Sequence, residues 1–171
     1  SGAYQIRAAQ NDAERALIWK GRKGAFSAVG RLSPQYVVQD GVVPRSSLGE
    51  ALASIEALSQ KYNLRVANVF HAGDGNLHPL ILFDSTDADQ WQRAEHFGAD
   101  ILELCVELGG TVTGEHGVGI EKINSMCVQF TPGELEAFFA VKRAFDPPGL
   151  LNPGKAIPTL ARCAEYGKMH I

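Results

Sequence analysis

The sequence predicts an α+β fold, in which a partly antiparallel sheet packs against helices. Three observations lead to this class. Apolar strand-like runs alternate with amphipathic helical stretches, two of those runs meet at the dipeptide Asp74-Gly75, and a chain of 171 residues suits one domain. Asp-Gly between two apolar runs is a strong signal for a β-hairpin with a two-residue loop, and a hairpin makes its strands antiparallel. We therefore expect residues 1–171 to form a single domain with a C-terminal tail.

Each predicted element follows from its periodicity and from the residues that bound it. Strands are expected where apolar and β-branched residues run together, and helices where apolar residues recur at helical spacing behind a capping residue. The predicted strands cover residues 36–43, 65–70, 77–83 and 111–113. The first predicted helix covers 8–28, and the second is capped by Ser46 or Ser47, with Glu50 completing a capping box. A long helix is predicted from 86 or 87 to Gly109-Gly110. Two further helices are predicted over 120–127 and 132–145. The Pro- and Gly-rich residues after 145 should form an ordered loop.

Composition excludes several classes of partner. The formal net charge is −3, so no basic field attracts nucleic acid. No apolar run approaches the ~20 residues of a membrane-spanning helix, and we expect a protein that is not integral to a membrane. Cys105, Cys127 and Cys163 are odd in number and widely spaced, which argues against a disulfide framework. The cysteines therefore suggest a reducing compartment and a cytoplasmic protein.

The stretch HAGDGNLH, residues 71–78, has a histidine at each end of the predicted turn. With Asp74-Gly75 as the loop, His71 would lie directly opposite His78, and their Cβ atoms would be ~4.5–5.5 Å apart on one face. A single histidine near a strand end is more often a packed polar residue, and Asp74 is an ordinary turn former. An opposed pair flanked by glycines instead favours two imidazoles that bind one metal ion.

The segment GEHGVG, residues 114–119, supplies the carboxylate that two imidazoles lack as a metal site. Zinc and related metals take three or four protein ligands, commonly with a carboxylate among them. We expect Glu115 to be the third ligand and His116 to stay free as a base near neutral pH. The alternative is a Gly-rich turn that binds an anion through backbone N–H groups. Neither GxGxxG, the Walker pattern nor HExxH is present at these motifs.

Three motifs in order, HAGDGNLHP, GEHGVG and the tail FDPPGLLNPGK, resemble the C-terminal half of FAD-linked oxidases of the vanillyl-alcohol-oxidase superfamily. The likeness is greatest to members that act on D-2-hydroxy acids, namely glycolate oxidase FAD-binding subunits and D-lactate and D-2-hydroxyglutarate dehydrogenases. It implies a ferredoxin-like substrate (cap) domain, possibly incomplete in its opening strands, followed by a helical and loop tail. It also implies that the N-terminal FAD-binding domain is absent from this chain.

The same resemblance implies a function and a set of site residues. Such enzymes remove hydride from a small D-2-hydroxy acid and transfer it to FAD, and they bind a divalent metal, here expected to be zinc, manganese or iron. A chain without the flavin domain should be inactive alone. The implied roles are metal ligation by His71, His78 and Glu115, proton abstraction by His116, substrate carboxylate binding by Arg22, and flavin contact by Asn152. His96 and His170 have no motif around them and are left out of the site.

We expect partner subunits for this chain, and two other functions remain as alternatives. The likeness to glycolate oxidase implies an iron–sulfur partner subunit, and a truncated sheet edge is prone to pairing in a homodimer. The alternative from another class is a non-catalytic metal-binding or subunit-docking module whose histidines are structural. A metallohydrolase is a further alternative, because the same ligands suit hydrolysis.

Overall fold

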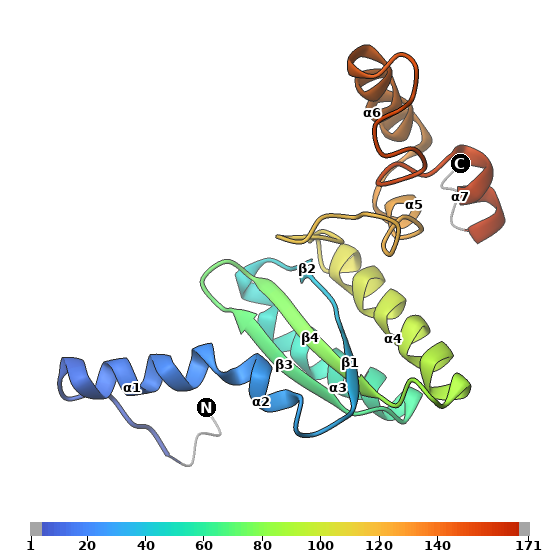
Figure 1. Ribbon diagram of the computed structural model, residues 1–171. Coiled ribbons are helices and arrows are strands. Elements are labelled where there is room, and N and C mark those ends of the chain that lie inside the picture. The colour runs from blue at the N-terminus through green and yellow to red at the C-terminus, as the bar shows by residue number, and fades with distance from the viewer. Residues whose placement is uncertain (1–4, 168–171) are drawn as a thin grey trace.

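The fold is described from a computed structural model, which covers residues 5–167; His170 therefore lies outside the described residues. A small antiparallel sheet forms its centre (Figure 1). Strand β4 (Asn76–Phe83) is the middle strand and is buried along its whole length. Strand β3 (Val66–His71) pairs with one side of β4, and β1 (Gln35–Val38) followed by β2 (Gly41–Val42) pairs with the other. The predicted strand over 36–43 is therefore interrupted, at Gln39 and Asp40.

The two faces of β4 are covered differently because successive side chains alternate between them. Leu77, Ile81 and Phe83 face helices α3 (Leu48–Tyr62) and α4 (Ala88–Glu107), which together form the main core. That core includes the fully buried residues Ala51, Ile55, Phe97, Ile101 and Cys105.

The opposite face of β4 carries Asn76, His78, Leu80 and Leu82. Helix α2 (Ala25–Val29) covers Leu80 and Leu82 through Phe26 and Val29. Helix α1 (Asp12–Lys23) precedes α2 and lies at the surface. The hairpin end of this face, with Asn76 and His78, is thus left for the loop that follows α4.

The predicted α+β class is confirmed, and the order of the elements is that of a ferredoxin-like βαββα unit. The chain runs from β1 and β2 through α3 to β3, β4 and α4, and the strands lie in the order β1–β4–β3. After α4, Thr111 makes a single antiparallel bridge with Val42 at the free edge of β2. The predicted strand over 111–113 is reduced to this bridge, which delivers the following loop to the sheet.

The hairpin has a different register from the one expected. Its loop has four residues, 72–75, because the N–H groups of Asp74 and Gly75 both donate to the carbonyl of His71. His71 therefore pairs with Asn76, and His78 pairs with Val69. Gly75 belongs to the loop and packs against Val43. Its φ is 78°, and its carbonyl accepts from the N–H of Val43. A Cβ added at Gly75 would lie 2.1 Å from the Val43 carbonyl oxygen.

Helix boundaries follow the predicted signals at two helices, but most of the helix predicted over 120–127 is wrong, because residues 120–125 form turns and a helix begins only at Met126. Asp87 caps α4 with its side chain, and the turn at Gly109, with φ 79°, follows the helix. Thr131 and Glu134 form a capping box at α6 (Pro132–Phe145), which has the predicted bounds. The capping box predicted for Ser47 is wrong. A 3-10 turn, Arg45–Ser47, leads into α3, and the side chain of Ser47 makes no cap hydrogen bond. The first predicted helix is divided into α1 and α2 at Gly24.

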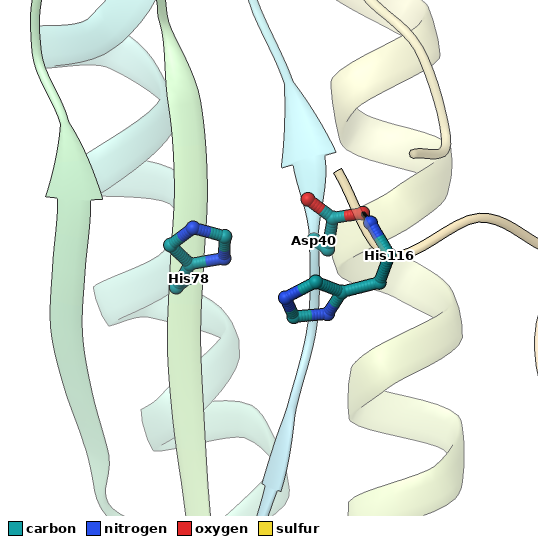
Figure 2. Close-up of side chains that lie close together, drawn as sticks. All are labelled: Asp40, His78 and His116. Atoms are coloured by element: carbon teal, nitrogen blue, oxygen red, sulfur yellow. Dashed lines mark hydrogen bonds between the residues drawn. The ribbon is translucent and has the colours of Figure 1, made fainter. Parts of the chain in front are cut away.

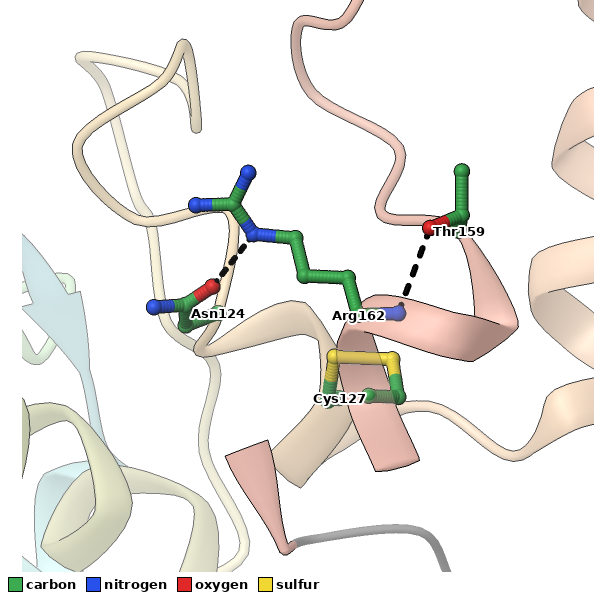
Figure 3. Close-up of a disulfide and its surroundings, with 5 residues drawn as sticks. Asn124, Cys127, Thr159 and Arg162 are labelled. Carbon is green, nitrogen blue, oxygen red and sulfur yellow. Dashed lines mark hydrogen bonds between the residues drawn. A yellow bond between two sulfur atoms is a disulfide. The ribbon is translucent and has the colours of Figure 1, made fainter. Parts of the chain in front are cut away.

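The C-terminal part lies beyond the end of α4 (Figure 1) and contains α5 (Met126–Gln129), α6 and α7 (Leu160–Tyr166). The predicted loop separates α6 from α7, but α7 itself was not expected. Cys127 on α5 and Cys163 on α7 form a disulfide (Figure 3), so the argument against disulfides is wrong. Chain spacing could not reveal this pair because α6 folds back and brings residues 36 positions apart together. Cys105 remains a free, buried thiol.

Candidate metal centre

The carboxylate of Glu115 lies between the two histidines of the hairpin. Its Oε1 is 3.5 Å from His71 Nε2, and its Oε2 is 3.5 Å from His78 Nε2. Candidate ligand atoms from all three residues lie within 4.8 Å of one another. The structure thus brings together the three residues predicted as metal ligands.

The two contacts of the Glu115 carboxylate are longer than hydrogen bonds. An N–H···O hydrogen bond has a donor–acceptor distance of about 2.7–3.2 Å, shorter than both contacts. Zinc bonds of about 2.0–2.2 Å at a tetrahedral angle place a ligand nitrogen and a ligand oxygen about 3.3–3.5 Å apart. Each Glu115 oxygen lies 3.5 Å from a different imidazole nitrogen, which is close to that spacing for a single nitrogen–oxygen pair.

Burial favours the neutral form of the His78 imidazole. Its side chain is 3% exposed, and burial, which opposes the charged imidazolium, lowers its pKa although Glu115 acts in the other direction. Within residues 5–167, its Nδ1 has no hydrogen-bond partner, and the same holds for the buried Oδ1 of Asn76. A neutral imidazole is the form that binds a metal ion, so burial prepares His78 for ligation.

His116 lies beside the cluster rather than within it. Its ring stacks on His78, with centroids 5.2 Å apart and an interplanar angle of 12° (Figure 2). The residue is exposed, in contrast to His78. The structure therefore leaves His116 accessible and outside the Glu115 contact, but within a second group of possible metal ligands that it forms with Asp40 and His78.

Arg22 approaches the cluster from α1. Its Nη2 donates to the carbonyl of Phe70, the residue before His71, at 3.2 Å. Arg22 and His71 line the same pocket of about 610 Å³, together with Ile18, Trp19 and Phe70. A guanidinium beside an apolar wall can bind a small carboxylate that also reaches the imidazole of His71.

Asn152 is not brought to this cluster. It lies in the exposed tail between α6 and α7, with a left-handed φ of 44°, and Figure 1 shows that tail away from the β3–β4 hairpin. Buried Asp146 orders the start of the tail, because its carboxylate accepts from the N–H groups of Leu150 and Leu151 and from Lys142 Nζ.

Asp40 was missed in the sequence and is the most connected carboxylate near the centre. It is fully buried in the break between β1 and β2, beside the loop that carries His116 (Figure 2). Its oxygens accept from the N–H groups of Gly114, Glu115 and His116 at 2.9–3.1 Å and from Thr113 Oγ1 at 2.7 Å. The signal that could have revealed it is an aspartate inside the apolar run YVVQDGVV.

Lys122 neutralises Asp40. It is 5% exposed, and its Nζ lies 3.2 Å from both Asp40 Oδ2 and the Asp40 carbonyl oxygen. Burial opposes ionisation of Asp40, but the N–H of His116, the hydroxyl of Thr113, the N–H of Glu115 and the ammonium of Lys122 outweigh it. The pKa of Asp40 therefore lies well below its ordinary value. Burial in turn lowers the pKa of Lys122.

The sequence of the chain is similar to that of known FAD linked oxidases. The family model of FAD linked oxidases, C-terminal domain, matches residues 1–156. The chain belongs to this family. Similar relatives of this FAD linked oxidase domain are the glycolate oxidase subunit GlcD of Escherichia coli strain K12, 61% identical over the whole chain, and that of Bacillus subtilis strain 168, 39% identical over 94% of it. The mitochondrial D-lactate dehydrogenase [cytochrome] of Arabidopsis thaliana is 33% identical over 92%.

The FAD linked oxidase domain spans about a third of the length of these relatives, with 34%, 34% and 28% covered. Among solved structures, the 4-ethylphenol oxidase from Gulosibacter chungangensis, an isoeugenol complex, matches with a TM-score of 0.59 at 14% identity. That match covers 90% of this chain and 32% of the oxidase, and it supports the fold. No helix within residues 5–167 combines the length and apolar character needed to cross a membrane.

Proposed function

We propose that this chain is the substrate-binding part of an FAD-dependent dehydrogenase or oxidase of small D-2-hydroxy acids of the glycolate or D-lactate type. The observation that carries the proposal is the Glu115 carboxylate placed 3.5 Å from both His71 Nε2 and His78 Nε2. Relatives named glycolate oxidase subunit and D-lactate dehydrogenase support the substrate class. In this proposal His71, His78 and Glu115 hold a divalent cation, with zinc as the first choice and manganese or iron as alternatives, since mixed nitrogen and oxygen ligands suit all three.

The residues around the centre divide the work on a 2-hydroxy acid. Arg22 binds the substrate carboxylate through the guanidinium donors that Phe70 does not use, and a planar fork suits that group. His116 accepts the proton of the 2-hydroxyl, because its exposed ring stands next to the ligand His78. A divalent cation bound there would lower the pKa of the hydroxyl, and FAD would supply the hydride acceptor.

We also propose a flavin contact, a partner subunit and a cellular location for this protein. Asn152, held in a left-handed turn of the exposed tail, contacts the flavin in this proposal. We assign the main flavin-binding domain to sequence outside this chain, which spans 34% of the GlcD relative. The printed name of the GlcD relatives describes a subunit, which supports a partner subunit; we assign it an iron–sulfur cluster. We also propose a homodimer and a cytoplasmic location. The Cys127–Cys163 disulfide removes the cysteine pattern as an argument for that location.

Metal analysis tests the proposal. Protein purified without a nickel column should contain about one equivalent of zinc or another divalent metal, and His71→Ala and Glu115→Ala should lose at least about nine tenths of it. His116→Ala should keep the metal, while the full-length enzyme that carries it loses most of its turnover. Equal metal content in the wild type and in the two ligand variants would instead support the non-catalytic docking module.

A further inference from the structure

We propose that Asp40 is the positioning residue of the metal centre: its buried carboxylate, paired with Lys122, fixes the loop that carries Glu115 and His116 against the histidines of the sheet. The proposal rests on the proposed function, since it explains how that metal site is assembled. Asp40, His78 and His116 have candidate ligand atoms within 4.8 Å of one another. The Asp40 carboxylate nevertheless accepts from backbone N–H groups, from Thr113 and from Lys122, so we assign it a role through the backbone of the loop.

The side chain of Glu115 does little to fix its own position. It is 52% exposed, and its contacts with the two imidazoles are 3.5 Å long, longer than hydrogen bonds. The ring of His116 is exposed as well. The positions of both groups relative to β4 therefore depend on what holds their backbone.

Asp40 holds that backbone at three consecutive residues. The N–H groups of Gly114, Glu115 and His116 converge on one carboxylate, as N–H groups do in anion-binding nests. The anion-binding loop considered for GEHGVG is thus real, but its anion is an internal carboxylate. Hydrogen bonds to a charged acceptor are shorter and stronger than neutral ones, so the loop is held firmly.

Neighbouring contacts extend this hold to both ends of the loop. Thr113 donates its hydroxyl to Asp40 and accepts from the N–H of Gly117, which closes the loop around the carboxylate. Lys122 ties Asp40 to the segment after the loop. Asp40 itself sits between β1 and β2, both of which pair with β4, the strand of His78. One side chain therefore links the carboxylate ligand to the histidine strand.

The test compares Asp40→Asn with Asp146→Asn in the protein that carries this chain. Asp146 is a matched control, because its buried carboxylate also accepts two backbone N–H groups and a lysine, but in the tail. Zinc affinity is measured by competition with a chromophoric chelator, and coordination is measured from the visible spectrum of the Co²⁺-loaded protein. Circular dichroism establishes that each variant is folded.

In Asp40→Asn the zinc Kd should rise at least about tenfold and the Co²⁺ bands should weaken, because the amide NH₂ faces N–H donors and Lys122. Asp146→Asn should keep the wild-type Kd and spectrum. A folded Asp40→Asn with wild-type Kd and spectrum would overturn the proposal. If Asp40→Asn does not fold, Thr113→Val, which removes one donor to Asp40, replaces it: a raised zinc Kd supports the proposal and a wild-type Kd overturns it.

A metal-independent readout separates this proposal from the proposed function. Wild-type protein that binds no zinc would contradict the proposed function. Hydrogen exchange then decides the role of Asp40: faster exchange of the amides of residues 114–116 in Asp40→Asn, but not in Asp146→Asn, supports it. Unchanged exchange at those three amides overturns it.

Discussion

His71 and His78 lie diagonally across the β3–β4 hairpin, with ring centroids 5.3 Å apart and ring planes at 87°. Both rings project from the same face of the sheet, since His71 pairs with Asn76 and His78 is two residues further along β4. Diagonal neighbours remain within reach of ring side chains. One carboxylate can therefore meet both imidazoles, although their exposure differs: the His71 side chain is 44% exposed and the His78 side chain 3%.

This difference in burial predicts different costs for the two ligand variants. His78→Ala should lower the free energy of unfolding of the metal-free protein by about 1–3 kcal/mol, because it leaves a cavity beside Phe26 and His116. His71→Ala should change it by less than about 0.5 kcal/mol. Urea titration in the presence of a chelator measures both values, and equal costs would contradict the different burial.

Gly114 should tolerate no side chain. An added Cβ would lie 2.7 Å from Asn76 Oδ1 and 2.7 Å from Val42 Cγ2. Gly114→Ala should therefore destabilise the protein by about 1–3 kcal/mol and weaken zinc binding, because the loop must move away from β4. Gly133→Ala on α6 is the control, since nothing lies within 4 Å of its added Cβ. The idea fails if both variants melt at the wild-type temperature and bind zinc equally.

Reduction of the disulfide should loosen the C-terminal part. Cys127 and Cys163 are 36 residues apart, and the chain-entropy model gives about 3–4 kcal/mol for a closed loop of that size. Thermal unfolding of the wild type should shift to lower temperature in a phosphine reductant. The Cys127→Ser/Cys163→Ser double variant should melt at the same temperature with and without it. Three titratable thiols in unreduced, denatured wild-type protein would contradict the disulfide.

Metal-free protein should lose stability as the pH falls below about 6.5, the ordinary pKa of histidine. Burial lowers the pKa of His78 in the folded state, so below that pH the unfolded chain binds more protons than the folded one. The contribution of His78 is thus present above the unfolded pKa and is lost as the pH falls toward the folded pKa. Urea titrations between pH 7.5 and pH 5.0 should show a flatter dependence in His78→Asn; parallel curves would argue against the shift.

Arg22 should determine substrate affinity in the full-length enzyme. Arg22→Lys should raise KM for the 2-hydroxy acid about 10- to 100-fold, because a lysine cannot donate two parallel hydrogen bonds to a carboxylate. Arg15→Lys is the control on the same helix, where the arginine pairs with Asp12 at the surface. Steady-state kinetics with both variants provide the measurement, and a wild-type KM in Arg22→Lys would remove Arg22 from the substrate site.

Local signals predicted much of the fold. The capping residues of α4 and α6, the hairpin at Asp74-Gly75 and the buried strand β4 depend on neighbours in the chain, and they are present as expected. The hairpin register was wrong by two residues because Gly75 packs on Val43, a contact between distant segments. Since strand side chains alternate with a period of two, an even shift left both histidines on the predicted face.

The sequence by itself determined the chemistry of this protein: two imidazoles around a turn, a carboxylate and a histidine between glycines, and the motifs of an FAD-linked oxidase domain. Tertiary structure alone decided how these groups meet, because hydrogen bonds between distant segments have no period or spacing in the chain. Asp40 and Gly114 are 74 residues apart, Asp40 and Lys122 are 82 residues apart, and Cys127 meets Cys163 across α6. Burial of a charged side chain such as Asp40 is unfavourable unless it finds a partner, and the fold supplies that partner from a distant segment.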